Sequence, residues 1–302
     1  MRNFTFKGLF LAVVFIVLGS LSIQAADGLI TKQITIKLDE AGTLPNKIGS
    51  TKKFQITNLK IIGEINGRDL QMIREMAGKD VRGNDTDGML SVLDLSDAKI
   101  VEGGGYNING FYYPTSNDKI GDNAFCDCSG LTSLTLPSGV TEIGNAAFEG
   151  CSGLASLTLP SGVTKIGYSA FLRCSGLTSL TLPSGVAKIG DYAFHGCSGL
   201  TSIYVYAEKL PNMGNDVFEG CDAKKCTVYV LKGTYDDYWL SEFGYFENIV
   251  EFDPTGINNV ITSNDAKELS RYSLNGQRLS APSKGLNIVK YSDGSVKKVV
   301  VQ

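Results

Sequence analysis

The residues best able to do chemistry in this sequence are its seven cysteines, five of which recur at a nearly fixed interval. Four successive intervals of 23, 23, 23 and 24 residues separate Cys128, Cys151, Cys174, Cys197 and Cys221. A structural zinc site would need two closely spaced cysteine pairs, and the flanking Cys126 and Cys226 do not complete such a motif. The spacing therefore predicts one small buried hydrophobic residue per repeat, with no metal and no cofactor.

Distance alone leaves disulfides open, because neighbouring coils of a solenoid stack about 4.8 Å apart. The pairing state of Cys126, Cys128, Cys221 and Cys226 is therefore undecided at this point. Cys126 and Cys226 lie outside the column, so these are the thiols to test for oxidation in an oxidising compartment.

Catalytic groups are harder to find. His195 is the single histidine, and it occupies a variable repeat position that holds Glu149, Leu172 and Glu219 in the other copies. A position that changes with every copy is typical of solvated surface, so we predict no catalytic residue and no enzyme. Glu142 is followed one and two coils later by Lys165 and Lys188, which we interpret as exposed cross-coil charge partners.

These residues sit in a repeat. CSGLTSLTLPSGVTEIGNAAFEG (128–150) and CSGLASLTLPSGVTKIGYSAFLR (151–173) are identical at 17 of 23 positions. A third copy spans 174–196, a degenerate fourth spans 197–220, and 120–127 supplies the tail of an earlier one. A period in the low twenties predicts a solenoid, in which each unit buries its apolar residues against its neighbours.

The spacing inside one copy predicts the shape of a coil. Leu154, Leu157 and Leu159 follow the L-x-x-L-x-L pattern of a leucine-rich repeat, which predicts a short parallel strand. Residues 168–174 suit a single helical turn closed by Gly176. The equivalent turn-start position in the other copies holds side chains that could cap the turn: Asp122, Asn145, Asp191 and Asn215. The fold class is therefore a repeat solenoid (α+β), a right-handed leucine-rich-repeat coil with short parallel strands.

The unit I-G-x-x-A-F-x-x-C-S-G-L-T-S-L-T-L-P-S-G-V-T resembles the leucine-rich repeat of BspA-like surface proteins over residues 120–221. Segments 65–78, 93–104 and 226–239 resemble the flanks of such proteins more loosely. The resemblance implies a bacterial exported protein active in adhesion or host interaction, and it implies no catalysis.

Export is also indicated by the start of the chain. Arg2 and Lys7 precede an apolar run from Leu9 to Leu18, and small residues follow up to Ala26. We interpret residues 1–26 as a secretory signal peptide, since the run is shorter than the roughly 20 residues that a membrane span needs. The expected location is the cell surface or the extracellular space, with the periplasm as an alternative, and no later segment is expected to span a membrane.

Residues 27–119 carry no repeat and are expected to form an N-terminal cap. The patterns predict strands at 34–38 and 55–62, a helix at 69–77, and a first irregular coil near Leu93. Residues 84–88 are interpreted as a polar turn in preference to a calcium loop. A surface loop is expected at 102–118, and its aromatics would either stack on a ligand or cover the first coil: Tyr106, Phe111, Tyr112 and Tyr113.

After the repeats, residues 222–253 are expected to form a C-terminal cap, with strands at 227–231 and 249–252, an aromatic-rich helix at 235–246 and Trp239 in its core. Residues 254–267 are predicted to be a linker. Residues 268–302 predict a small β module of two hairpins, turning at Asn275-Gly276 and Asp293-Gly294. This module resembles the C-terminal sorting domain of type IX secretion cargo; a third cap or a spacer is the alternative.

The repeats offer a surface for binding. Polar and tyrosine side chains should project from successive strands on one face: Ser133, Thr135, Ser156, Thr158, Ser179, Thr181, Ser202, Tyr204 and Tyr206. This face is either a ligand platform or a way to keep the sheet soluble, and the tyrosines favour the platform. With a net charge of −3, no nucleic-acid partner is expected. We therefore predict recognition of an extracellular or host protein, with a glycan bound by exposed aromatics as the alternative.

Overall fold

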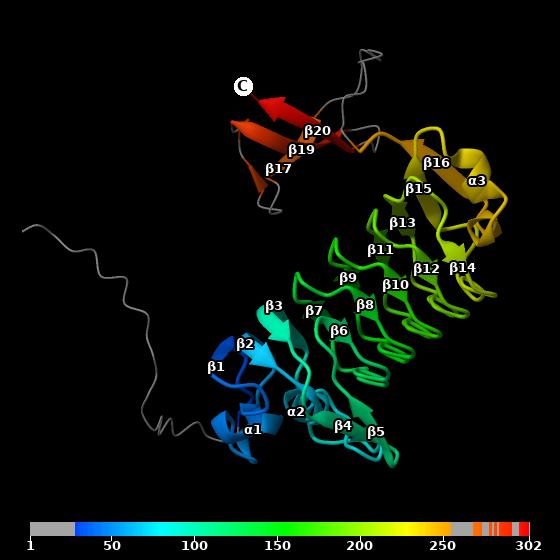
Figure 1. Ribbon diagram of the computed structural model, residues 1–302. Helices are drawn as coiled ribbons and strands as arrows, with labels where there is room; N and C mark the ends of the chain where they lie inside the picture. Colours follow the sequence, from blue (N-terminus) through cyan, green and yellow to red (C-terminus); the bar gives the residue numbers. More distant parts are fainter. Residues whose placement is uncertain are drawn as a thin grey trace, which may run out of the picture.

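The computed structural model describes residues 28–254, 268–273, 278–279, 281–282, 284–291 and 296–301. The predicted signal peptide, residues 255–267 of the predicted linker and both predicted hairpin turns lie outside these residues. In the described part, coils stack side by side along a curved path from an N-terminal to a C-terminal cap (Figure 1). The solenoid predicted from the repeats is therefore confirmed. No helix in the described ranges is both long and apolar enough to cross a membrane.

The N-terminal cap supplies the first three strands of a nine-stranded sheet, in the order β1-β2-β3-β7-β9-β11-β13-β15-β16. Its elements are β1 (Ile34–Leu38), α1 (Leu44–Lys47), the 3-10 turn η1 (Lys52–Phe54), β2 (Asn58–Ile65), α2 (Gly67–Met76) and β3 (Val92–Ile100). The predicted strand at 34–38 and the predicted helix are confirmed, whereas the second strand begins three residues later than expected. Asn66 starts α2 with a capping box, in which its side chain accepts from the Arg68 amide.

The segment expected to be a loop at 102–118 is a hairpin of β4 (Gly105–Ile108) and β5 (Phe111–Pro114). Asn109 and Gly110 connect the strands, and both have positive φ, at 52° and 84°. Such a pair is what the tight two-residue turn of a hairpin requires.

Each repeat coil contributes one strand to each of two parallel sheets. The large sheet contains β7 (Ser133–Thr135), β9 (Ser156–Thr158), β11 (Ser179–Leu182) and β13 (Ser202–Val205). The five-stranded sheet contains β6 (Lys119–Ile120), β8 (Glu142–Ile143), β10 (Lys165–Ile166), β12 (Lys188–Ile189) and β14 (Asn212–Met213). Equivalent residues of consecutive copies face one another, for example Leu157 and Leu180.

The third side of each coil is not the helical turn that the sequence predicted. It is a run of tight turns in which Ser169 and Arg173 have φ values of 52° and 59°. The amides of Ser169, Phe171 and Arg173 donate to Asp191, Ala193 and His195 of the next coil. In a helical turn these amides would donate to carbonyls of the same turn. The observed conformation is favoured because it lets them donate to carbonyls of the next coil. Gly176 is needed for a different reason, because a Cβ there would lie 2.4 Å from the Ser152 carbonyl oxygen.

Three of the four side chains predicted to cap that turn accept from the next coil instead. Asp122 Oδ1 accepts from the Asn145 amide at 2.7 Å, and Asn145 Oδ1 accepts from the Tyr168 amide at 2.9 Å. Asp191 Oδ1 accepts from the Asn215 amide at 2.9 Å. Capping was therefore the wrong role, since the stacked coils place each acceptor beside the following turn. The side chain of Tyr168 has no carbonyl or carboxyl oxygen, so the ladder of side-chain acceptors is interrupted at its position.

Two columns of side chains fill the interior of the array. Phenylalanine rings of neighbouring coils stack with centroids 5.1–5.8 Å apart, at Phe125, Phe148, Phe171, Phe194 and Phe218. The five-cysteine column is buried, as predicted. Its four later thiols donate to phenylalanine carbonyls of the preceding coil, as Cys174 does to Phe148 at 3.0 Å. Burial raises the pKa of Cys174 to about 12. These thiols are therefore packing groups held in the protonated form.

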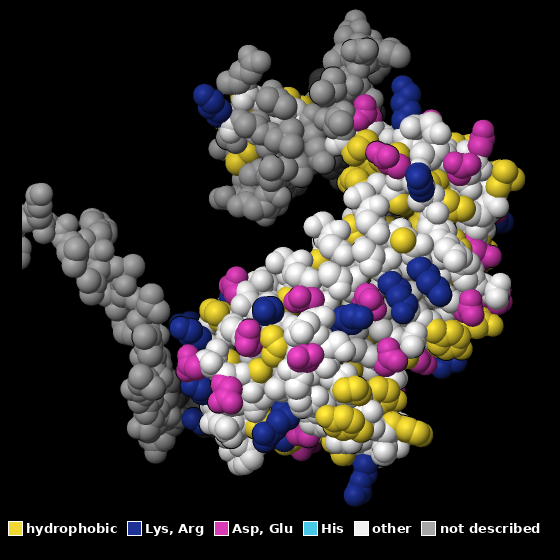
Figure 2. Space-filling view, viewed as in Figure 1, with side chains coloured by type: hydrophobic (Ala, Val, Ile, Leu, Met, Phe, Trp, Pro, Cys, Tyr) yellow, Lys and Arg dark blue, Asp and Glu magenta, His cyan; other side chains and the backbone are white. Residues whose placement is uncertain are grey.

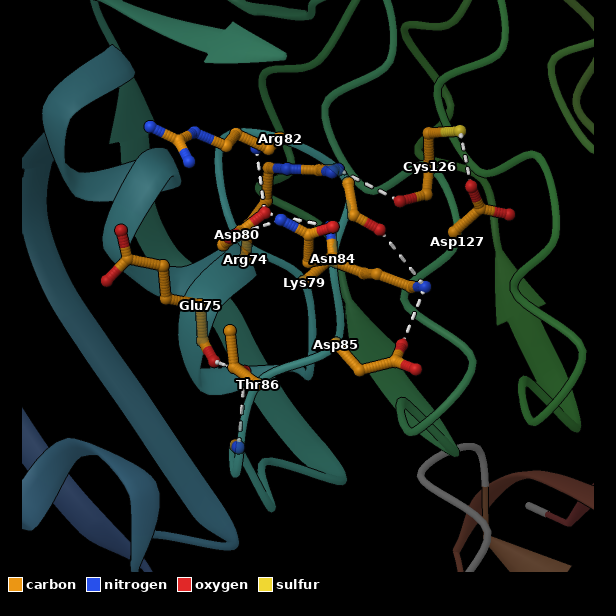
Figure 3. A network of polar contacts seen from close by, with 12 residues as sticks. Arg74, Glu75, Lys79, Asp80, Arg82, Asn84, Asp85, Thr86, Cys126 and Asp127 are labelled. Carbon is orange, nitrogen blue, oxygen red and sulfur yellow. Dashed lines mark hydrogen bonds and ion pairs between the residues drawn. The ribbon is translucent and has the colours of Figure 1, made fainter. Parts of the chain in front are cut away.

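The N-terminal cap closes the first coil with side-chain donors (Figure 3). In each later coil, three backbone carbonyls of the turn segment accept hydrogen bonds from amides of the preceding coil. The equivalent carbonyls of the first coil belong to Asp122, Ala124 and Cys126. The Asp122 carbonyl accepts from the Tyr106 hydroxyl at 2.7 Å. Arg74, which is 1% exposed, donates Nη1 to the Ala124 and Cys126 carbonyls at 3.4 and 3.0 Å. The cap thus replaces the missing coil at each of the three positions.

The turn at 84–88 is held by its own segment. Asp80 Oδ1 accepts from the amides of Arg82 and Asn84 at 2.7 and 2.8 Å, and Lys79 pairs with Asp85 at 2.8 Å (Figure 3). The described residues contain no group of three or more potential ligands that could hold a metal ion.

The C-terminal cap consists of β15 (Thr227–Leu231), α3 (Tyr235–Trp239), the 3-10 turn η2 (Glu242–Tyr245) and β16 (Asn248–Phe252). The helix predicted at 235–246 is therefore two short pieces, of which the second packs Phe243 against Phe218. Trp239 was predicted to be core and is 45% exposed, so that prediction is wrong. It stacks on the exposed Tyr235, because Tyr238 and Phe243 already fill the space beneath the cap.

The C-terminal module is a four-stranded sheet in the order β18-β17-β19-β20. Its strands are β17 (Glu268–Ser273), β18 (Arg278–Leu279), β19 (Gly285–Tyr291) and β20 (Val296–Val301). Strands β17 and β18 pair antiparallel, as do β19 and β20, which confirms the two predicted hairpins. A role in sorting stays a prediction.

Candidate functional site

Eight of the nine predicted binding residues lie on strands of the large sheet. The serines of β7, β9, β11 and β13 pair in one row, which contains Ser133, Ser156, Ser179 and Ser202. Thr158 pairs with Thr181, and Thr181 pairs with Tyr204, while Thr135 ends β7 and Tyr206 follows β13. We call these nine residues the repeat face.

Exposure changes along the repeat face. Ser133, Thr135, Ser156 and Thr158 are exposed, whereas the residues of the later coils are half-buried. Ser202 Oγ donates to Ser179 Oγ at 3.0 Å, which joins two coils through side chains. The first half of the face is therefore free hydroxyl surface, and the second half is partly covered.

An aromatic cluster lies at this later end of the repeat face. The Tyr204 ring stacks on Tyr229 with centroids 4.6 Å apart and planes 8° apart. Phe252 presents its ring edge-on to Tyr204 at 6.2 Å and to Tyr206 at 5.3 Å. Burial raises the pKa of Tyr204, so its hydroxyl stays protonated near neutral pH.

Tyr229 and Phe252 were missed by sequence reasoning because they lie beyond Cys221, where the repeat pattern ends. The rows nevertheless continue there, since Ser202 pairs with Thr227 and Tyr204 pairs with Tyr229. The signal that could have found Tyr229 is the alternation of polar and apolar residues in TVYVL, which continues the outward-facing positions of β13.

The aromatics of the hairpin do not join this cluster. Tyr106 is fully buried, Tyr113 is half-buried against it, and Phe111 and Tyr112 are 68% and 59% exposed. The two alternatives for this segment therefore divide between its residues: Tyr106 covers the first coil, while Phe111 and Tyr112 face solvent. A glycan platform would need six aromatics to be exposed together, and the burial of Tyr106 rules this out: Tyr106, Phe111, Tyr112, Tyr113, Tyr204 and Tyr206.

The polar residues considered for catalysis lie apart from the repeat face. Glu142 pairs with Lys119 of the preceding coil at 3.0 Å, and not with Lys165 as predicted. His195 is partly exposed, with its Nδ1 3.8 Å from the Glu219 carboxylate and its ring edge-on to Tyr192. These are contacts between the side chains of neighbouring coils.

The repeat geometry can be compared with known families. The family model for the BspA type leucine-rich repeat region, with six copies, matches residues 104–229. This match makes the stretch similar to BspA-type leucine-rich-repeat regions. It extends the resemblance seen in the sequence to the hairpin β4–β5 at one end and to Tyr229 at the other. The leucine-rich-repeat class predicted for the fold is thus confirmed.

Three solved structures with similar chains are two leucine-rich-repeat proteins and one vaccine antigen. A leucine-rich-repeat protein of T. pallidum is 27% identical, with 40% of this chain and 64% of that chain covered and a TM-score of 0.31. Pneumococcal vaccine antigen PcpA is 15% identical (65% and 57% covered; TM-score 0.36). A leucine-rich-repeat protein of Bacteroides ovatus is 19% identical (66% and 61% covered; TM-score 0.26).

In each case the matched part spans less than two thirds of the solved chain. A search of the curated proteins found no match.

Proposed function

We propose that this chain is an exported, non-enzymatic binding protein that recognises an extracellular protein through the repeat face. The observation that carries the proposal is the aromatic cluster at the end of the polar rows. Tyr204 and Tyr206 remain half-exposed while Tyr229 and Phe252 hold their rings in place. Tyrosines fixed in this way bind with little loss of conformational entropy, and they are enriched at protein interfaces.

The exposed hydroxyl rows extend the proposed contact surface. Ser133, Thr135, Ser156 and Thr158 offer donors and acceptors that can adapt to a partner, while the tyrosine end supplies apolar area. An extended rigid platform of this kind suits a macromolecule better than a small ligand. Export to the cell surface, or beyond it, is part of the proposal and is supported by the predicted signal peptide.

The test is a binding screen of the purified chain from residue 27 onward against a panel of extracellular matrix proteins, with a glycan panel beside it. A double variant with Tyr204→Ser and Tyr206→Ser should lose at least tenfold in affinity for the protein that binds, as expected when central aromatic residues are truncated. Tyr168→Ser is the matched control, because Tyr168 is 52% exposed and lies on the turn side of its coil.

Saturable binding that the double variant loses and the control keeps would support recognition through the repeat face. Equal loss in both variants, or no binding by any matrix protein, would contradict it. Unchanged thermal unfolding midpoints of the variants would show that the loss is not a folding defect.

A further inference from the structure

A groove of about 240 Å³ lies where the hairpin β4–β5 meets the five-stranded sheet of the first coils. None of its lining residues belongs to the repeat face. Figure 2 shows exposed apolar side chains gathered over this hairpin, where Phe111 and Tyr112 are the exposed aromatics. The groove is therefore a second candidate surface, independent of the proposed protein-binding function.

The aromatic wall of the groove is Tyr113. One face of its ring is covered by Tyr106, with centroids 5.7 Å apart and planes 18° apart, so a ligand could use only the other face. Tyr106 is itself fixed, because it is fully buried and its hydroxyl donates to the Asp122 carbonyl. Gly121 makes room for it, since a Cβ there would lie 2.5 Å from that hydroxyl. The wall is thus a rigid half-exposed ring.

The floor of the groove is backbone. Gly121, Gly144 and Gly167 follow β6, β8 and β10, and all three line the groove without a side chain to fill it. Two of them cannot be replaced without movement, since a Cβ on Gly144 or Gly167 would come within 2.6 Å of the preceding coil's backbone. The stacking of the coils therefore keeps this floor open.

The rim carries balanced charge. Lys119 and Lys165 contribute two positive charges, and Asp122 and Glu142 contribute two negative charges, so the formal sum is zero. Lys119 and Glu142 already pair at 3.0 Å, and Asp122 accepts from the Asn145 side chain at 3.2 Å. The groove thus offers hydrogen-bond donors and acceptors in fixed places without a net field for a charged ligand.

We propose that this groove binds a neutral saccharide. A sugar ring has an apolar C–H face that can lie on the free side of Tyr113, and hydroxyls that donate to Asp122 or Glu142 and accept from Lys165. A rim with equal numbers of acidic and basic groups favours neither sign of ligand charge overall, and an apolar ligand would strip water from four charged groups. The class that fits both the ring and the rim is a neutral, hydroxyl-rich ligand.

The experiment is isothermal titration of the full chain with neutral oligosaccharides of glucose, mannose, galactose and N-acetylglucosamine, beside a short neutral peptide. Tyr113→Leu keeps apolar volume against Tyr106 and removes the aromatic face, and we expect it to weaken saccharide binding at least tenfold. The control is Tyr112→Leu, because Tyr112 pairs with Asn107 and points to the opposite face of the hairpin. It should change the affinity by less than twofold.

Glu142→Gln is the second variant and keeps the proposal testable if Tyr113→Leu fails to fold. It keeps the shape of the side chain and should weaken saccharide binding severalfold. The Tyr204→Ser/Tyr206→Ser variant should bind saccharide normally, which separates this proposal from the repeat face. The proposal is overturned if no oligosaccharide binds, if only the peptide binds, or if Tyr112→Leu weakens binding as much as Tyr113→Leu.

Discussion

The interior of the repeat array and its first coil satisfy the same backbone carbonyls with different groups. Inside the array, the Tyr168, Ala170 and Leu172 carbonyls accept from amides of the preceding coil. At the first coil, the corresponding carbonyls accept from Arg74 and Tyr106 of the cap. A repeating unit brings its own donors as long as another unit precedes it. At the end of the stack, side chains from an unrelated segment must take their place.

The two regions also differ in what they show to solvent. The repeats present mainly serine and threonine on the large sheet, whereas the segments at the ends expose large aromatics, at Phe111, Tyr112, Tyr235 and Trp239. Identical coils can only repeat the same surface. The irregular ends are therefore where specific contacts can be built, which is why both proposed sites include an end of the array.

The stability of the two regions should differ most at alkaline pH, because residues 28–119 contain no cysteine and the array contains a buried cysteine column. Burial raises the pKa of Cys174 and Cys221 from 9.0 to about 12. The unfolded chain therefore releases these protons first, and stability is full below pH 9 and falls as the pH rises toward 12. At pH 10.5 each such thiol should cost about 2 kcal/mol.

Urea unfolding followed by circular dichroism at pH 8 and pH 10.5 measures this loss. A Cys174→Ala variant should lose less stability between the two pH values than the wild type. An equal loss in the two proteins would show that the thiols do not cause it.

Removing one ring from the phenylalanine column should be the most destabilising single substitution. Phe171→Ala deletes a fully buried ring between Phe148 and Phe194, and a loss of about 3–5 kcal/mol is expected. Phe111→Ala removes the same group from the exposed end of the hairpin and should cost less than about 0.5 kcal/mol. Similar losses at both positions would mean that the array is not held by its interior column.

Replacing the buried guanidinium of Arg74 in the N-terminal cap should have the next largest effect on stability. Arg74→Met leaves the Ala124 and Cys126 carbonyls without their donor, and we expect a loss of about 2–4 kcal/mol. Arg82→Met is the control, because Arg82 is exposed. Hydrogen exchange should also show faster opening of the first coil than of the third in Arg74→Met, and uniform exchange would argue against a local role for the cap.

Removing a single hydroxyl also tests whether donors from the cap stabilise the first coil, with a smaller expected loss of stability. Tyr106→Phe removes the donor to the Asp122 carbonyl while keeping the ring, so the free energy of unfolding should fall by about 1–2 kcal/mol. Tyr112→Phe, on the exposed face, should leave thermal stability unchanged. A neutral result for Tyr106→Phe would mean that water replaces the hydroxyl.

The smallest expected effect is a gain within the array. Ala146 has a φ of 50°, a left-handed conformation that a Cβ disfavours. Ala146→Gly should raise the unfolding free energy by about 0.5 kcal/mol, since the relief of strain exceeds the added entropy of the unfolded chain. The neighbouring Ala147, which is buried and has no positive φ, should lose stability when changed to glycine.

Much of this molecule could be predicted from its sequence. The 23-residue period required coils that stack on one another, and the alternation around Leu157 and Leu159 placed the strands and the outward-facing Ser and Thr rows of the repeat face. The recurrence of Cys174 and its equivalents placed a small residue in the core of each coil. These features depend on local pattern and on identity between copies, both of which are visible in one chain.

The tertiary structure decided where groups distant in sequence meet. Residues 168–174 could have formed a helical turn, and they did not because their amides bond to the next coil. Arg74 and Tyr106 carry no pattern that marks them as donors to the first coil, and Tyr229 and Phe252 join the repeat face only through strand pairing. Trp239 was expected inside and lies outside, because Tyr238 and Phe243 occupy the core beneath it. Local spacing determined the coil, and competition for a limited interior and for backbone partners decided its ends.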